Sequence, residues 1–125
     1  VSTLFPQYAE NSDEGYSNIT VQVRTLDWLR EKYGAPKYVK IDTEGSDAEV
    51  IRGMSFQPAM LSFEFLPEDL SVARKCVEQL PDRRFNYVLE QQARYALEDW
   101  VTAEQISRVL EDVPKTVFYG DVFAR

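Results

Sequence analysis

The amino-acid sequence predicts an α/β fold, in which helices cover both faces of a mostly parallel sheet and the last strand runs antiparallel. Short β-rich segments alternate with helical segments from residue 19 onward, the order that produces strands joined by helical crossovers. The run 59–65 is almost continuously apolar, as expected for a strand covered on both faces. The segment 38–53 has the pattern of a strand, an acidic turn with one glycine, and a helix, which is half of a βαβ unit.

The composition restricts the class of protein. With 125 residues, 44% of them hydrophobic, the chain is long enough for one core, and we expect a single domain over 1–125 with its α/β core at 18–125. The net charge of -7 argues against a nucleic-acid partner and against an anionic membrane surface. No apolar stretch is long enough to span a bilayer, and no signal-peptide pattern opens the chain. We expect a cytoplasmic location.

Histidine is absent from the sequence, and cysteine occurs once, at Cys76. An internal disulfide, a Ser-His-Asp triad, a Cys-His dyad and a His-ligated metal site are therefore excluded within this chain. Cys76 falls on an apolar helical face, where we expect a buried, unreactive thiol. Acid–base chemistry must come from carboxylates, lysine, tyrosine or backbone groups.

The N-terminal part predicts a loop, a strand and a helix. Residues 1–17 are polar and acidic and predict an extended loop, either a simple terminal segment or a flap that faces the substrate. Ile19–Val23 alternates apolar and polar residues, which predicts a strand with one solvated face. Thr25 is the expected N-cap of a helix with an apolar stripe, and Gly34 is its expected end.

The central segment predicts a buried strand at 38–41, an acidic turn from Asp42 to Gly45, and a helix that follows. Ser46 and Glu49 stand three residues apart, which is the spacing of a capping box at the start of that helix. Gly53 is its expected end.

The C-terminal half continues the alternation. Further strands are expected at 59–65, 85–90, 95–97 and 115–124. Pro67 is expected to open a helix that Pro81 closes. Thr102 and Gln105 have the capping-box spacing at the start of another helix. Gly120, inside the last strand, suggests a bulge or a close approach of backbones.

Three carboxylates are candidate site residues because they follow or end strands, where open α/β sheets bind ligands. Asp42 either acts as a general base that accepts a proton from a substrate or caps the turn before the helix. Glu44 is a second residue at the mouth of the site, a metal ligand together with Asp42, or a solvated turn carboxylate. Glu64 either points into the same cleft or reaches solvent. Lys40 either pairs with Glu64 or Asp42, or extends to solvent.

Two kinds of site are not expected. The acidic residues of 42–49 do not continue into the spacing of a calcium loop, so we expect no metal site. The five glycines form neither a G-x-G-x-x-G turn nor a phosphate-binding P-loop, so the sequence offers no nucleoside or phosphate cradle of its own.

The central segment resembles the FkbM family of S-adenosylmethionine-dependent methyltransferases. The resemblance rests on K-I-D-T-E-G at 40–45 and on V-I-R-G at 50–53. The strand pattern before T-L-D at 25–27, and L-S-F-E at 61–64, are similar to neighbouring parts of the same family. These matches run from about Val21 to Phe65, and beyond Leu66 only the order of strands and helices agrees.

The resemblance implies the C-terminal half of a domain that is Rossmann-like and of the class I methyltransferase type. It implies S-adenosylmethionine as cofactor, with Asp42 at its methionine end, and the hydroxyl of a carbohydrate or secondary metabolite as methyl acceptor. The family's Gly-rich cofactor loop has no counterpart here, so we expect a truncated chain that is inactive alone.

The resemblance also leaves the strand 38–41 with a free edge. We therefore expect self-association there, or pairing with the upstream half of the domain. The alternative function is a non-catalytic α/β scaffold or assembly module.

Overall fold

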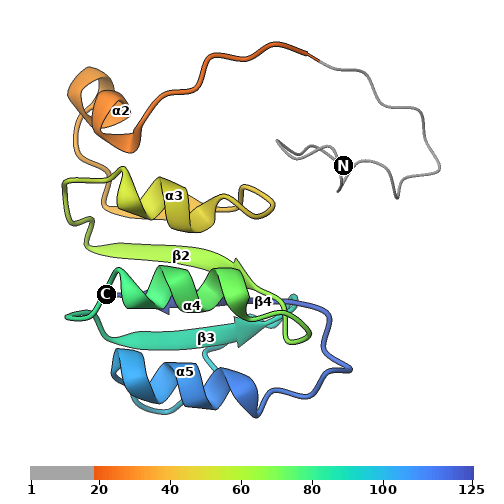
Figure 1. Cartoon of the computed structure of the whole chain (residues 1–125). Helices are drawn as coiled ribbons and strands as arrows, with labels where there is room; N and C mark the ends of the chain where they lie inside the picture. Colours follow the sequence, from red (N-terminus) through yellow and green to blue (C-terminus); the bar gives the residue numbers. More distant parts are fainter. Residues whose placement is uncertain (1–18) are drawn as a thin grey trace.

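Four strands form one sheet in the computed structural model, which describes residues 19–125 (Figure 1). The strands are β1 (Tyr38–Ile41), β2 (Met60–Phe65), β3 (Phe85–Leu89) and β4 (Gly120–Ala124). The helices are α2 (Leu26–Tyr33), α3 (Asp47–Arg52), α4 (Ser71–Glu78) and α5 (Ala103–Glu111). The predicted α/β class is confirmed. The loop expected at 1–17 lies outside the described residues.

The sheet is mixed, with the strand order β1-β2-β4-β3. β1 and β2 pair in parallel, whereas β4 pairs antiparallel with both β2 and β3. The prediction of an antiparallel last strand is confirmed. The prediction of a mostly parallel, Rossmann-like sheet is wrong for the described strands. β2 and β3 point the same way, but β4 returns between them and separates them, which the order of elements along the chain does not show.

The described helices that pack on the sheet cover one of its faces. α3, α4 and α5 lie side by side in front of the strands (Figure 1), and α4 contacts both of its neighbours. The prediction of helices on both faces is therefore wrong for residues 19–125. The opposite face carries no described helix and is partly covered by the segment 90–101, which follows β3 and bonds to its outer edge.

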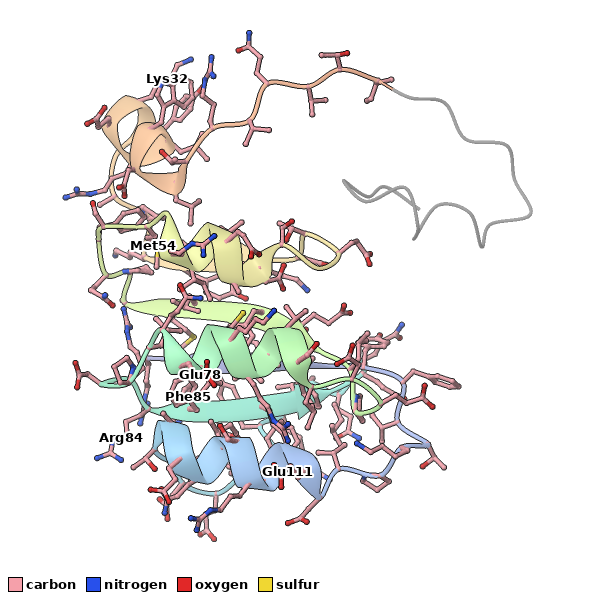
Figure 2. All side chains as sticks on the ribbon, viewed as in Figure 1. Lys32, Met54, Glu78, Arg84, Phe85 and Glu111 are labelled. Atoms are coloured by element: carbon pink, nitrogen blue, oxygen red, sulfur yellow. The ribbon has the colours of Figure 1, made fainter. Side chains whose placement is uncertain are left out.

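The core lies between the sheet and this helical layer. Alternate strand residues face the helices, because successive side chains of a strand point to opposite faces. Phe85 on β3 lies in this interface and is fully buried (Figure 2). The other buried apolar residues of the strands are Val39, Ile41, Leu61, Phe63, Phe65, Val122 and Ala124. The helices contribute Ala48, Ile51, Ala73, Cys76, Val77, Ile106 and Leu110.

Three of the four helices begin after the predicted N-cap residue, and two of these caps form the expected side-chain hydrogen bond. The capping box of α5 is confirmed, because Thr102 Oγ1 accepts from the Gln105 N–H at 3.2 Å and Gln105 Oε1 accepts from the Thr102 N–H at 2.9 Å. Thr25 caps α2, accepting from the Trp28 N–H at 3.1 Å. The start predicted at Pro67 is wrong: residues 67 and 68 form a turn between the bridged residues Leu66 and Asp69, and α4 begins at Ser71.

Three predicted strand segments do not form as expected. Ile19–Val23 is not a strand, and its apolar residues are 56–80% exposed, because no described strand pairs with it. Residues 95–97 are not a strand either, although the Ala96 N–H donates to the Tyr87 carbonyl. The last strand begins at Gly120 rather than at 115. The close approach of backbones predicted at Gly120 is confirmed, because a Cβ there would lie 2.7 Å from the carbonyl oxygen of Val88.

Arg83 holds the opposite end of the sheet, where β2 and β3 begin. Its guanidinium donates to Gln57 Oε1 at 2.7 and 3.1 Å and to the Pro58 carbonyl at 2.6 Å. This fork joins the segment before β2 to the segment before β3. Among residues 19–125, no helix has the length and apolar character needed to cross a membrane.

Candidate functional site

The carboxyl ends of β1 and β2 lie side by side because these two strands are parallel and in register. Ile41 pairs with Phe63, so Asp42 and Glu64 follow at the same level of the sheet. Glu44 lies two residues further along, in the turn that leads to α3. The three carboxylates predicted from the sequence are therefore brought to one end of the sheet.

The turn between β1 and α3 is held by a buried carboxylate. Asp47 is 3% exposed, and its Oδ1 accepts from the Thr43 N–H at 2.9 Å and from the Thr43 hydroxyl at 2.6 Å. Glu44 and Gly45 both have positive φ, 54° and 112°. Glycine adopts this conformation freely, whereas at Glu44 it carries a backbone strain on the order of 1 kcal/mol. The turn is thus fixed from within, with Glu44 at its tip.

The capping box predicted from Ser46 and Glu49 does not form. Ser46 precedes the helix but makes no side-chain hydrogen bond to it. Asp47, at the first position of α3, instead turns its carboxylate back to Thr43. The acidic residue therefore closes the turn rather than capping the helix, a role that spacing alone did not indicate.

Lys40 links β1 to β4 on the open face of the sheet. Its Nζ lies 3.7 Å from Asp42 Oδ2 and 3.5 Å from Asp121 Oδ1. Burial lowers the pKa of Lys40, but the carboxylates of Asp121 and Asp42 outweigh it, and the net pKa is raised. Lys40 thus pairs with Asp42, one of the two partners expected. The sequence analysis did not predict Asp121 as a partner of Lys40. Asp121 is a single acid within an apolar strand, which is the same pattern that made Glu64 a candidate.

A small cavity of about 160 Å³ lies between the turn and the start of α4. Glu44, Asp47, Glu64 and Asp69 line it, together with apolar residues of β2 and α4. Asp42 is not among the lining residues, and its carboxylate lies on the Lys40 side of the strand end. The site therefore has two parts: an acidic cavity with Glu44 and Glu64, and the group formed by Lys40, Asp42 and Asp121.

The negative charges of both parts of the site act on the carboxylate of Glu64. Burial raises its pKa above the ordinary value of 4.5, and the negative charges of Asp42, Glu44 and Asp121 raise it further. A carboxylate with a raised pKa binds a proton more tightly than an ordinary one, which suits a group that accepts a proton from a substrate.

A family model of the methyltransferase FkbM domain matches residues 2–89 of the chain. The chain belongs to the FkbM methyltransferase family. The comparisons with curated proteins and with solved structures found no match. The match contains the acidic turn and both parallel strands of the FkbM domain, and hence Lys40, Asp42, Glu44 and Glu64. It ends at the last residue of β3, so α5, β4 and Asp121 lie beyond it.

Membership of the FkbM family suggests use of S-adenosylmethionine, and the described residues fit one end of that molecule. The acidic lining of the small cavity complements the positive sulfonium and ammonium groups. Its volume of about 160 Å³ is too small for the nucleoside. No turn of residues 19–125 joins a strand to a helix with more than one glycine. Within that range, we find no group of three residues arranged to hold a metal ion.

Proposed function

We propose that this FkbM domain acts in S-adenosylmethionine-dependent methylation of a hydroxyl group, on a carbohydrate or a secondary metabolite. Two findings support the proposal. The chain belongs to a methyltransferase family, and its candidate carboxylates gather at the carboxyl ends of the parallel pair β1–β2. Methyl transfer to oxygen needs a well-positioned acceptor and a group that takes its proton, and it needs no covalent intermediate. The main support for the proposal is therefore that three carboxylates, Asp42, Glu44 and Glu64, lie together and can supply such a group.

The bound cofactor would supply a sulfonium methyl group to the acceptor oxygen in line: an O–CH₃ bond would form as the S–CH₃ bond breaks, with a neutral thioether as the leaving group. In this proposal Glu64 takes the hydroxyl proton: the O–H bond breaks, and the proton passes to the carboxylate. Its raised pKa favours that role at neutral pH. Asp42, engaged with Lys40, orients the site, and Glu44 contributes negative charge facing the cationic end of the cofactor.

The nucleoside end of the cofactor would be held by polypeptide other than residues 19–125. β1 pairs with β2 on one side, and its other edge has no described partner. A strand added along this edge would extend the sheet beside the acidic turn. We propose that such a strand, from the upstream half of the domain or from a second copy of the chain, completes the cofactor site.

Calorimetry with S-adenosylmethionine tests whether residues 19–125 hold only one end of the cofactor and other polypeptide holds the nucleoside. The 125-residue chain should bind weakly, and a chimera carrying the first half of another FkbM domain should bind with micromolar affinity. Micromolar binding by the chain alone would contradict the division. Absence of binding in both proteins would favour the alternative, a non-catalytic scaffold module.

In the chimera, Glu64→Gln should abolish most methyl transfer and weaken cofactor binding much less, because other acids, Glu44 among them, keep the small cavity acidic. Glu68→Gln, at an exposed position nearby, serves as the control. Unchanged transfer by the Glu64→Gln protein would rule out Glu64 as the proton acceptor.

A further inference from the structure

The sheet face opposite the helices carries a row of aromatic side chains. Tyr38 on β1 stacks with Phe123 on β4 at 6.4 Å between ring centroids. Tyr95, in the segment that follows β3, meets Phe123 edge to face at 5.3 Å and Trp100 at 5.1 Å. Tyr95 is 41% exposed, so this row presents ring surface to solvent.

A second cavity, of about 450 Å³, lies beside this row. Its walls are β3, β4 and the segment 90–95, and its lining includes Glu90, Arg94, Tyr95, Asp121 and Phe123. The volume falls within the range of small-molecule sites, roughly 300 to 1,000 Å³. Aromatic side chains together with a few polar groups are also the typical lining of such sites.

The outer wall of the cavity is anchored by a buried amide. Asn86 is 1% exposed; its Nδ2 donates to the Leu97 carbonyl at 2.9 Å, and its Oδ1 accepts from the Leu97 N–H at 3.0 Å. The Ala96 N–H also donates to the Tyr87 carbonyl at 2.8 Å. These bonds fix Tyr95 over the sheet, so the wall is formed before any ligand binds.

The cavity adjoins the proposed proton acceptor. Asp121, which lines it, pairs directly with Glu64 in the register of β2 and β4. Residues paired across antiparallel strands lie about 5 Å apart and project to the same face. A ring held in the cavity would therefore extend toward Glu64 across a single strand.

We propose that this cavity is the acceptor subsite, and that Tyr95 and Asp121 select a neutral, hydroxyl-bearing ring over an anionic one; this rests on the proposed function. The Tyr95 ring packs against the apolar face of the acceptor, and Asp121 accepts hydrogen bonds from its hydroxyls. Two acids, Glu90 and Asp121, and one base, Arg94, line the cavity, which leaves a charge of −1. Next to Asp121, Lys40 and Glu64 add one charge of each sign, so the surroundings keep a net charge of −1.

Tryptophan fluorescence tests the subsite without the cofactor. The chain has two tryptophans, so Trp28→Phe leaves Trp100, which contacts Tyr95, as the reporter. Titration with methyl β-glucopyranoside should change this fluorescence saturably at millimolar concentration, whereas glucuronate should bind about tenfold more weakly or not at all. In this background, Tyr95→Leu and Asp121→Asn should each weaken binding of the glucoside by about tenfold.

Glu104→Gln on the exposed side of α5 is the control and should bind as the parent does. Circular dichroism shows whether each variant is folded, and Asp121→Asn, which preserves side-chain shape, is decisive if Tyr95→Leu unfolds. Equal binding of glucuronate, full binding by Asp121→Asn, or no saturable change with the glucoside would overturn the proposal. Failed methyl transfer with intact glucoside binding would instead count against the proposed function alone.

Discussion

Glu64 and Asp121 show how single residues set the character of the site. Both are acids inside apolar strands, and they pair across β2 and β4 on the open face of the sheet. Lys40 lies within 3.5 Å of Asp121, and no cation is paired with Glu64 among the ion pairs of residues 19–125. The result is an acid whose neighbours are mostly acids, which raises the pKa of Glu64.

Glu64→Gln should therefore stabilise the folded chain at neutral pH. The native pKa of Glu64 is raised above 4.5, so above that pH the native state binds more protons than the unfolded state, and stability falls as pH rises. Glutamine does not titrate. Thermal unfolding should show a higher Tm for the variant at pH 7 and little difference at pH 4. An equal gain at both values, or a gain matched by Glu68→Gln, would contradict this.

Gly120→Ala should be strongly destabilising. An added Cβ would lie 2.3 Å from the Phe65 ring and 2.7 Å from the Val88 carbonyl, so a backbone contact has to move. Such overpacking costs roughly 1 to 3 kcal/mol. Gly53→Ala is the matched control, because its Cβ would have no contact closer than 3.5 Å. Urea unfolding should separate the two variants; similar midpoints would refute the close approach.

At the scale of elements, the helices differ in how firmly they are attached. α5 combines a complete capping box with the buried residues Ile106 and Leu110. α2 is also capped by a threonine, but none of its residues is buried. Helical stability in proteins comes mainly from packing, so α2 should open locally while α5 unfolds with the whole domain.

Thr102→Ala and Thr25→Ala provide a matched test of that difference. Each removes one N-cap hydrogen bond, worth about 1 kcal/mol to its helix. Thr102→Ala should lower the free energy of global unfolding by about that amount. Thr25→Ala should change it little and instead accelerate amide exchange within α2. A similar global loss for both variants would show that α2 unfolds together with the core.

At the scale of the whole molecule, the core is one layer between the sheet and three helices. Cys76 on α4 lies in this layer with no exposed surface. Burial raises the pKa of its thiol to about 12, so the reactive thiolate is scarce in the folded protein.

Cys76 should therefore report global unfolding. A disulfide reagent at pH 8 should label the native chain slowly and the urea-unfolded chain within seconds to minutes. Labelling of the native chain should speed up with urea in proportion to the unfolded fraction. Cys76→Ser should remove all labelling, because the chain has a single cysteine. Rapid labelling without urea would show that the α4 face opens independently.

Much of the site could be predicted because its signals are local. A β-rich run followed by Asp42 and Gly45 indicates a strand and a turn, and the apolar run ending near Glu64 indicates the neighbouring strand. Asp121 and Tyr95 reach the site through the return of β4 between β2 and β3, a long-range pairing that local periodicity does not encode. Asp47 closes the turn because its carboxylate points back to Thr43 and not toward the helix. The spacing of residues in the sequence does not determine this direction.

Arg83 ties together the two chain segments that enter the sheet at the end away from the carboxylates. The sheet is thereby held together at this end, whereas one wall of the cavity of about 450 Å³ is the segment 90–95, which Asn86 anchors through Leu97. Exchanging residues 90–95 for a loop of different sequence should therefore change the proposed acceptor subsite while the sheet and its core remain folded.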